Sequence, residues 1–133
     1  MLIRETETGL TVITQPGHAW VAAQLAAHWG NETFARPEPW PDVILAIAIH
    51  DNGWTTWETL PERMPDTGRP RDFMHMPVFE HLHIWQQSII QAKVQSRYAA
   101  LLVSLHAITL AEWALAALEE DEEDQFLRRN FVD

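Results

Sequence analysis

Apolar residues recur at helical spacing in four long stretches of the chain, and this pattern predicts a mainly α fold. Proline near the start of the first two stretches and glycine after the first fit helix boundaries. Ahead of them, "LIRE" and "LTVIT" flank a Thr-Glu-Thr-Gly turn and predict a small N-terminal β-hairpin. The helices are expected over residues 16–29, 41–51, 77–95 and 98–118.

The polar stretches between these helices predict loops. Residues 59–77 contain four prolines and one glycine, and a loop of this length in a small domain is often functional. The acidic run "EEDEED" at 119–124 is expected to be a solvated helix end, followed by the short amphipathic tail "QFLRRNF".

Length and composition narrow the class of protein. A chain of 133 residues with 47% hydrophobic residues is expected to form a single globular domain over 1–133. The absence of cysteine excludes thiolate metal sites and cysteine nucleophiles. The net charge is −10 and Lys93 is the only lysine, which disfavours nucleic acid and anionic membranes as partners. A small anionic molecule remains possible, because one or two arginines or a metal ion can hold a phosphate.

The sequence also predicts a location. The N-terminus lacks the basic and apolar segments of a signal peptide, and no apolar stretch is expected to reach membrane-spanning length. We therefore expect a cytoplasmic protein without a membrane partner, whose oligomeric state the sequence leaves open.

The stretch "ILAIAIHDNGW" raises a chemical question. Six apolar residues of a helix that is apolar all round, and so expected at the centre, run directly into His50 and Asp51. A buried carboxylate is costly unless a hydrogen bond, a cation or a metal ion compensates its charge.

Other histidines are expected to point to the same interior. His18 lies in line with the apolar residues of the first helix, His106 sits in the middle of the apolar fourth helix, and His81 borders the apolar stripe of the third. His83 lies on the far side of its helix and His28 near a helix end, so both are expected at the surface. His75 lies in the long loop.

Imidazoles and a carboxylate without cysteine suit Mn, Fe, Zn, Ni or Co. The predicted ligands of one or two such ions are His18, His50, Asp51, His81 and His106. The alternative is that each histidine is merely hydrogen-bonded in the core.

The stretches "GHAWVAAQLAAHWG", "AIHDNGW" and "YAALLVSLH" resemble the HD-domain superfamily of metal-dependent phosphohydrolases, in an uncharacterised bacterial branch. The resemblance covers about residues 15–110 and implies a compact HD-like helical bundle. It implies metal ligation by His18, His50 and Asp51. Where the superfamily has a late aspartate, this chain offers His106 or Glu112. Glu112 points about 120° away from His106, so His106 is the expected ligand.

The resemblance also implies roles. Asp51 would be a ligand, bridging where two ions bind, and His81 a second-metal ligand or a general acid for the leaving group. The lysine that follows the His-Asp pair in many active members is replaced by Asn52-Gly53-Trp54.

Three residues are candidates for substrate binding. Arg69 or Arg71 of "GRPRDF" could reach an anion, the alternative being an exposed basic loop. Trp54 could line a pocket mouth, the alternative being packing.

Three functions follow from these expectations. The first is hydrolysis of a small phosphate ester by a metal-activated water. The second is a non-catalytic HD-like domain used for binding or structure. The third is an HD-type oxygenase with two irons.

Overall fold

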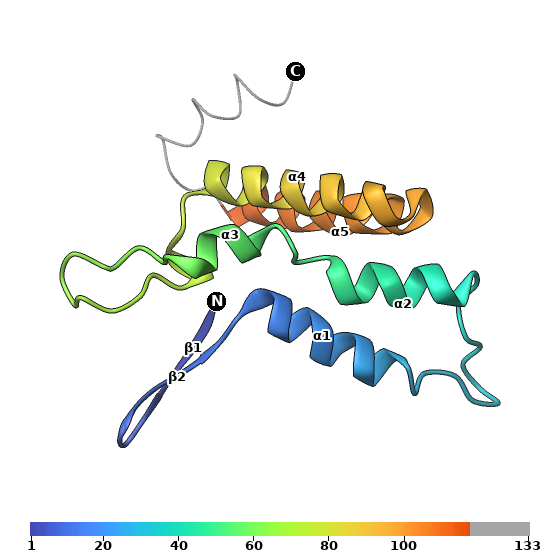
Figure 1. The fold of residues 1–133 in the computed structure, drawn as a ribbon, viewed down its shortest axis with the longest axis horizontal. Helices are drawn as coiled ribbons and strands as arrows, with labels where there is room; N and C mark the ends of the chain where they lie inside the picture. The colour runs from blue at the N-terminus through green and yellow to red at the C-terminus, as the bar shows by residue number, and fades with distance from the viewer. Residues whose placement is uncertain (118–133) are drawn as a thin grey trace.

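The computed structural model describes residues 1–117 and confirms a mainly helical fold with an N-terminal two-stranded hairpin. Strand β1 (Leu2–Thr6) pairs antiparallel with β2 (Gly9–Ile13), with Thr6 opposite Gly9 at the turn. The hairpin projects away from the helices beside the loop that follows α3 (Figure 1). The predicted acidic helix end and tail lie outside the described residues.

Helices α1 (Gln15–Ala26) and α2 (Trp40–Ile49) form one side of the molecule. The Thr14 hydroxyl caps α1 by accepting from the Gly17 amide at 3.1 Å. Helix α1 ends three residues before its predicted end, and α2 stops just before His50. His50 and Asp51 therefore stand in the turn after α2 rather than inside it.

The second half of the chain forms a helical hairpin of α4 (Val78–Gln95) and α5 (Arg97–Ala117), which pack side by side (Figure 1). Ser96, at their junction, donates a hydrogen bond to Asp42 of α2 and accepts one from the Ala99 amide. Helix α2 lies between α1 and α5 and contacts both, as its apolar sequence predicts.

Residues 60–77 form the predicted long loop, which contains an isolated β-bridge between Arg63 and Pro70 and the short 3₁₀ helix η1 (Phe73–His75). Before it lies a helix that the sequence did not indicate, α3 (Trp54–Thr59). Its six residues are too few for periodicity to reveal.

The buried side chains form two clusters. The first joins α2, α4 and α5 and contains Ala46, Ile49, Ala92, Ala99, Ala100 and Val103. The second lies under the long loop and contains Trp54, Met76 and Ile84. Small residues dominate the first cluster, so the helices approach closely.

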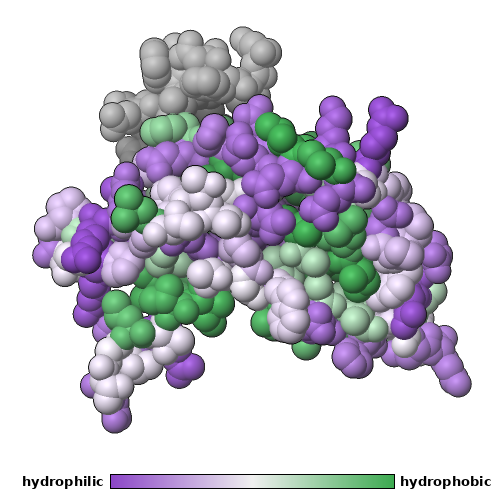
Figure 2. Space-filling view, viewed as in Figure 1, coloured by the Kyte–Doolittle hydropathy of each residue, from purple (hydrophilic) through white to green (hydrophobic). Residues whose placement is uncertain are grey.

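Helix α5 is far more exposed than its sequence predicts. Leu101, Leu105, Ile108 and Trp113 are each more than half exposed, and Figure 2 shows apolar side chains reaching the surface in several separate places. The expectation that no stretch reaches spanning length is wrong, because Arg97–Ala116 is long and apolar enough to cross a membrane. The core helix of a soluble protein has the same length and composition, so these two properties do not assign α5 to a membrane.

Candidate metal centre

Three potential metal ligands converge where α1 passes the end of α2. They are His18 of α1 and the adjacent His50 and Asp51, and their nearest ligand atoms all lie within 4.8 Å of one another. Ligand atoms around one ion at about 2.1 Å lie roughly 3–4 Å apart, so small side-chain rotations would bring them into register. Asp51 is buried and His50 half-buried, while His18 is open to solvent.

Hydrogen bonds fix the orientation of the His50 ring. Its Nδ1 lies 2.7 Å from the Ile47 carbonyl oxygen, to which it must donate, and its Nε2 lies 3.2 Å from Asp51 Oδ2. In the neutral ring the Nε2 lone pair would therefore face a carboxylate oxygen. A proton or a metal cation has to lie between these two atoms.

Without a metal, the proton is the natural occupant. Burial lowers the pKa of His50, but the hydrogen bond and charge of Asp51, together with the Ile47 carbonyl, outweigh burial and raise it above 6.5. The His50–Asp51 pair is thus an ion pair that a divalent cation would replace.

His106 of α5 lies at the edge of this group. Its ring meets the His50 ring edge to face, with 4.8 Å between centroids and an interplanar angle of 86°. Burial and the charges of His50 and His18 lower the pKa of His106, although the charge of Asp51 partly offsets them. A neutral imidazole at this point can bind a metal ion or carry a proton.

The predicted burial of His18 and His106 is wrong. Helix α1 buries Gln15, Ala19 and Ala23, and α5 buries Ala99, Ala100, Val103 and Ala107. Both helices are apolar on most sides, so spacing alone could not identify the buried face. His18 nevertheless approaches His50, with 5.8 Å between ring centroids, although its side chain is exposed to solvent.

His81 lies in a different environment from the group of three. Its ring contacts Trp54 and Trp85 at 5.5 and 5.3 Å between centroids, and its Nε2 is buried without a hydrogen-bond partner. Burial lowers the pKa of His81. A hydrogen bond with the Phe73 backbone and the charge of Glu80 raise it, but by less. His81 is therefore a neutral ring packed among aromatic side chains.

The three candidates for substrate binding lie in the second core cluster and in the long loop. Trp54 is 2% exposed and packs in the second core cluster. Arg69 pairs with Glu5 of the hairpin, and Arg71 pairs with Glu62 at 3.0 Å. Each arginine is thus already bound to a carboxylate of this chain.

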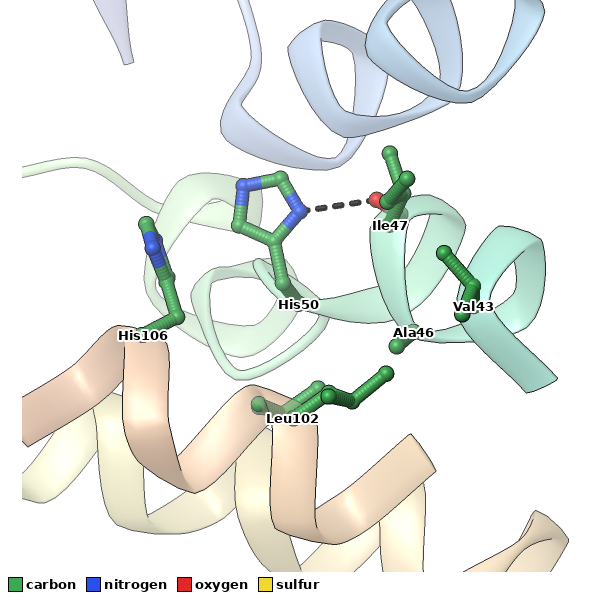
Figure 3. Close-up of a pocket in the computed structure, with 7 residues that line it drawn as sticks. Val43, Ala46, Ile47, His50, Leu102 and His106 are labelled. Carbon is green, nitrogen blue, oxygen red and sulfur yellow. Dashed lines mark hydrogen bonds between the residues drawn. The ribbon is translucent and has the colours of Figure 1, made fainter. Parts of the chain in front are cut away.

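A pocket of about 220 Å³ adjoins the histidines between α2 and α5 (Figure 3). His50 and His106 stand at one end of it and Val43 at the other. The remaining walls are Ala46, Ile47, Leu102 and Val103. Residues 43, 46, 47 and 50 share one face of α2, but a helix that is apolar all round does not reveal from sequence which face borders a pocket.

A second, larger pocket of about 440 Å³ lies between α3 and α4. His83 lines it together with Gln87 and Gln91, one and two helical turns further along α4. His83 is exposed, as expected. His28 and His75 are exposed too, and bond to the Gln24 carbonyl oxygen and to Asp72 respectively.

One comparison with known proteins gives a match. The model of a family described as "Protein of unknown function (DUF3891)" matches residues 1–131. No curated protein and no solved structure matches the chain. The resemblance to the HD-domain superfamily therefore stays a prediction.

Proposed function

The chain belongs to the DUF3891 family, and from its His-Asp group we propose that it is an HD-type metal-dependent hydrolase of a small phosphate ester. One observation carries the proposal: His18 of α1 and the adjacent His50 and Asp51 after α2 bring their ligand atoms within 4.8 Å of one another. Two imidazoles and a carboxylate suit a catalytic site, because three protein ligands leave a coordination position open.

The surrounding groups support a metal rather than a purely structural cluster. The Ile47 carbonyl accepts from Nδ1 of His50, the arrangement that orients metal-binding imidazoles. A bound ion would take the place of the His50 proton as the cation beside the buried carboxylate of Asp51. His18 and His106 remain accessible, so an ion and a small substrate can reach the group.

Each residue has a role in this proposal. A bound divalent ion would lower the pKa of a coordinated water and polarise a phosphoryl oxygen. Asp51 and His50 would hold the ion together with His18 of α1. His106, neutral and beside His50, could accept the proton that the attacking water loses and give it to the leaving-group oxygen, the general-acid role first expected of His81.

The donor set also favours a second candidate. A site of two histidines and one carboxylate with open positions is typical of non-haem iron oxygenases. Iron content and oxygen consumption on reduction would distinguish such an oxidative enzyme from a hydrolase. A protein that binds no ion would instead be the non-catalytic domain.

The experiment is metal analysis of protein purified without chelator or His-tag, followed by titration with Mn, Fe, Zn, Ni and Co. Phosphate release from a panel of small phosphate esters tests hydrolysis. His18→Ala should lower metal content and activity at least tenfold, whereas His28→Ala, on the turn after the same helix, should change neither. Equal metal content in both variants would contradict the site.

A further inference from the structure

We propose that the substrate carries a short aliphatic group, which binds in the pocket between α2 and α5 while its polar head reaches the His-Asp group. This inference rests on the proposed function and adds the class of substrate. The pocket ends at His50 and His106, so a molecule lying along it presents one end to the candidate metal ligands (Figure 3).

The walls of the pocket select for apolar groups. Val43, Ile47 and Leu102 are half-buried side chains that leave the space between the helices open, and Ala46 and Val103 are buried behind them. All five are aliphatic, and among the described residues the only titratable side chains on the wall are the two imidazoles at its end. A sugar or a nucleobase would lose hydrogen bonds to water there without replacement.

The length of the pocket limits the group. Val43 and His50 lie two turns apart on the same face, which corresponds to ~10 Å along the helix. This distance and a volume of about 220 Å³ fit an unbranched group of roughly four to eight carbons. Larger ring systems fit better in the 300–1,000 Å³ pockets that hold drug-sized ligands.

The arginines of the long loop do not line the pocket. The two arginines first expected to hold an anion are paired with Glu5 and Glu62. The head of the substrate would therefore be held by the metal ion and the imidazoles, and its affinity would depend on the apolar remainder.

The test uses straight-chain alkylphosphonates, from methyl to octyl, bound to the Mn²⁺-loaded protein and followed by calorimetry. Each added methylene should tighten binding about three- to fourfold until the pocket is full. The gain should then level off between butyl and octyl. An affinity that does not change with chain length would overturn the proposal.

Two variants fill the pocket and one serves as control. Leu102→Phe and Val43→Phe should abolish the gain with chain length, so that octylphosphonate binds either variant no more tightly than methylphosphonate does. Leu101→Phe, next to Leu102 on α5 but more than half exposed, should behave like wild type. The same loss in Leu101→Phe would overturn the assignment of the pocket. Melting curves confirm that each variant is folded, and either filling variant suffices.

A metal-free arm separates this proposal from the proposed function. Butanol, hexanol and octanol should shift the methyl resonances of Val43, Leu102 and Val103 at progressively lower concentrations. If no metal binds, the hydrolase proposal fails and this arm alone decides the pocket. If none of the three alcohols shifts these resonances, the pocket does not bind aliphatic groups, even if the protein binds metal.

Discussion

At the scale of single residues, His50 has the most constrained chemistry. Its Nδ1 donates to Ile47 and its Nε2 faces Asp51, so each nitrogen has one assigned partner. What occupies the space between Nε2 and the carboxylate distinguishes a metal site from an ion pair. Substitution of Asp51 tests this directly.

Asp51→Asn keeps the shape of the side chain and removes its charge. Excess Mn, Zn or Ni should raise the melting temperature of wild type by mass action, by the equivalent of about 2.7 kcal/mol at a hundredfold excess over Kd. The same metals should change the melting temperature of the variant little. Asp66→Asn in the exposed loop is the control and should respond like wild type. If no metal raises the melting temperature of the wild type, the metal-site proposal is wrong.

In the metal-free protein the same pair predicts a dependence on pH. The raised pKa of His50 means that its contribution to stability is complete below about pH 6.5 and is lost as pH rises through the folded value. Asp51→Asn should therefore destabilise metal-free protein at pH 5.5 by roughly 1–3 kcal/mol and much less at pH 8.5. Urea unfolding with chelator at both values measures this difference. Equal losses at the two values would show that His50 is not the partner.

His81 predicts the opposite slope. Its pKa is lowered, so the unfolded chain binds the proton more readily, and stability falls as pH drops below about 6.5 toward the folded value. His81→Phe should flatten this part of the profile, because phenylalanine suits contact with Trp54 and Trp85. His83→Phe, on the exposed side of α4, should leave the profile unchanged. Thermal melts of both variants and of wild type from pH 4.5 to 7.5 measure the two profiles.

At the scale of elements, the turn after α2 is held by its contact with α4. The Gly53 amide donates to Ser88 Oγ at 2.8 Å, and both groups are buried. A Cβ on Gly53 would collide with the Ile84 carbonyl oxygen and lie 2.7 Å from that hydroxyl. The position thus requires glycine because of space rather than backbone conformation, and it fixes the site to α4.

Gly53→Ala should destabilise the fold by about 1–3 kcal/mol, since α3 has to move away from α4. Ser88→Ala should cost about 1–3 kcal/mol through the unsatisfied amide. The double variant should not recover stability, because the Ile84 carbonyl still blocks the Cβ. Recovery in urea titrations of the double variant would show that the hydroxyl alone sets the distance.

The elements also show what the sequence could and could not predict. Proline and glycine positions located α1, α2 and the long loop, and apolar spacing located α4 and α5. The buried face of α1 could not be predicted, because Trp20, Val21 and Leu25 compete with small alanines that permit closer packing. Helix α3 was missed because tertiary contacts of Trp54, rather than periodicity, stabilise it.

The candidate site was predictable in part for a related reason. The abrupt change from apolar residues to His50-Asp51 indicates a buried charge. This prediction does not depend on the exact residue at which the helix ends. The approach of His18 depends on how α1 crosses α2, which spacing does not determine. His81 was misleading, because a histidine beside an apolar stripe can pack between indoles as readily as it can bind metal.

At the scale of the whole molecule, α1 is a peripheral helix. Its main contacts are with α2, and it reaches α4 and α5 little or not at all within the described residues. The segment from α1 to α2 passes through residues 27–39, which contain no helix or strand. Besides the covalent chain, α1 is therefore held by its face against α2 and by a smaller contact with α3, where the Gln15 amide donates to the Glu58 carboxylate.

An ion shared by His18, His50 and Asp51 would act as a reversible cross-link that closes the loop from residue 18 to residue 50. Because the three ligands meet only while α1 packs on α2, an ion bound to all three would oppose detachment of α1 by up to about 2.7 kcal/mol at a hundredfold excess over Kd. Amide hydrogens of Ala19 and Ala23 should exchange with solvent more slowly when metal is present, while those of Ala99 and Val103 change less. Metal occupancy would then set how often the first helix detaches, and cleavage by proteases within residues 27–39 would report the metal supply.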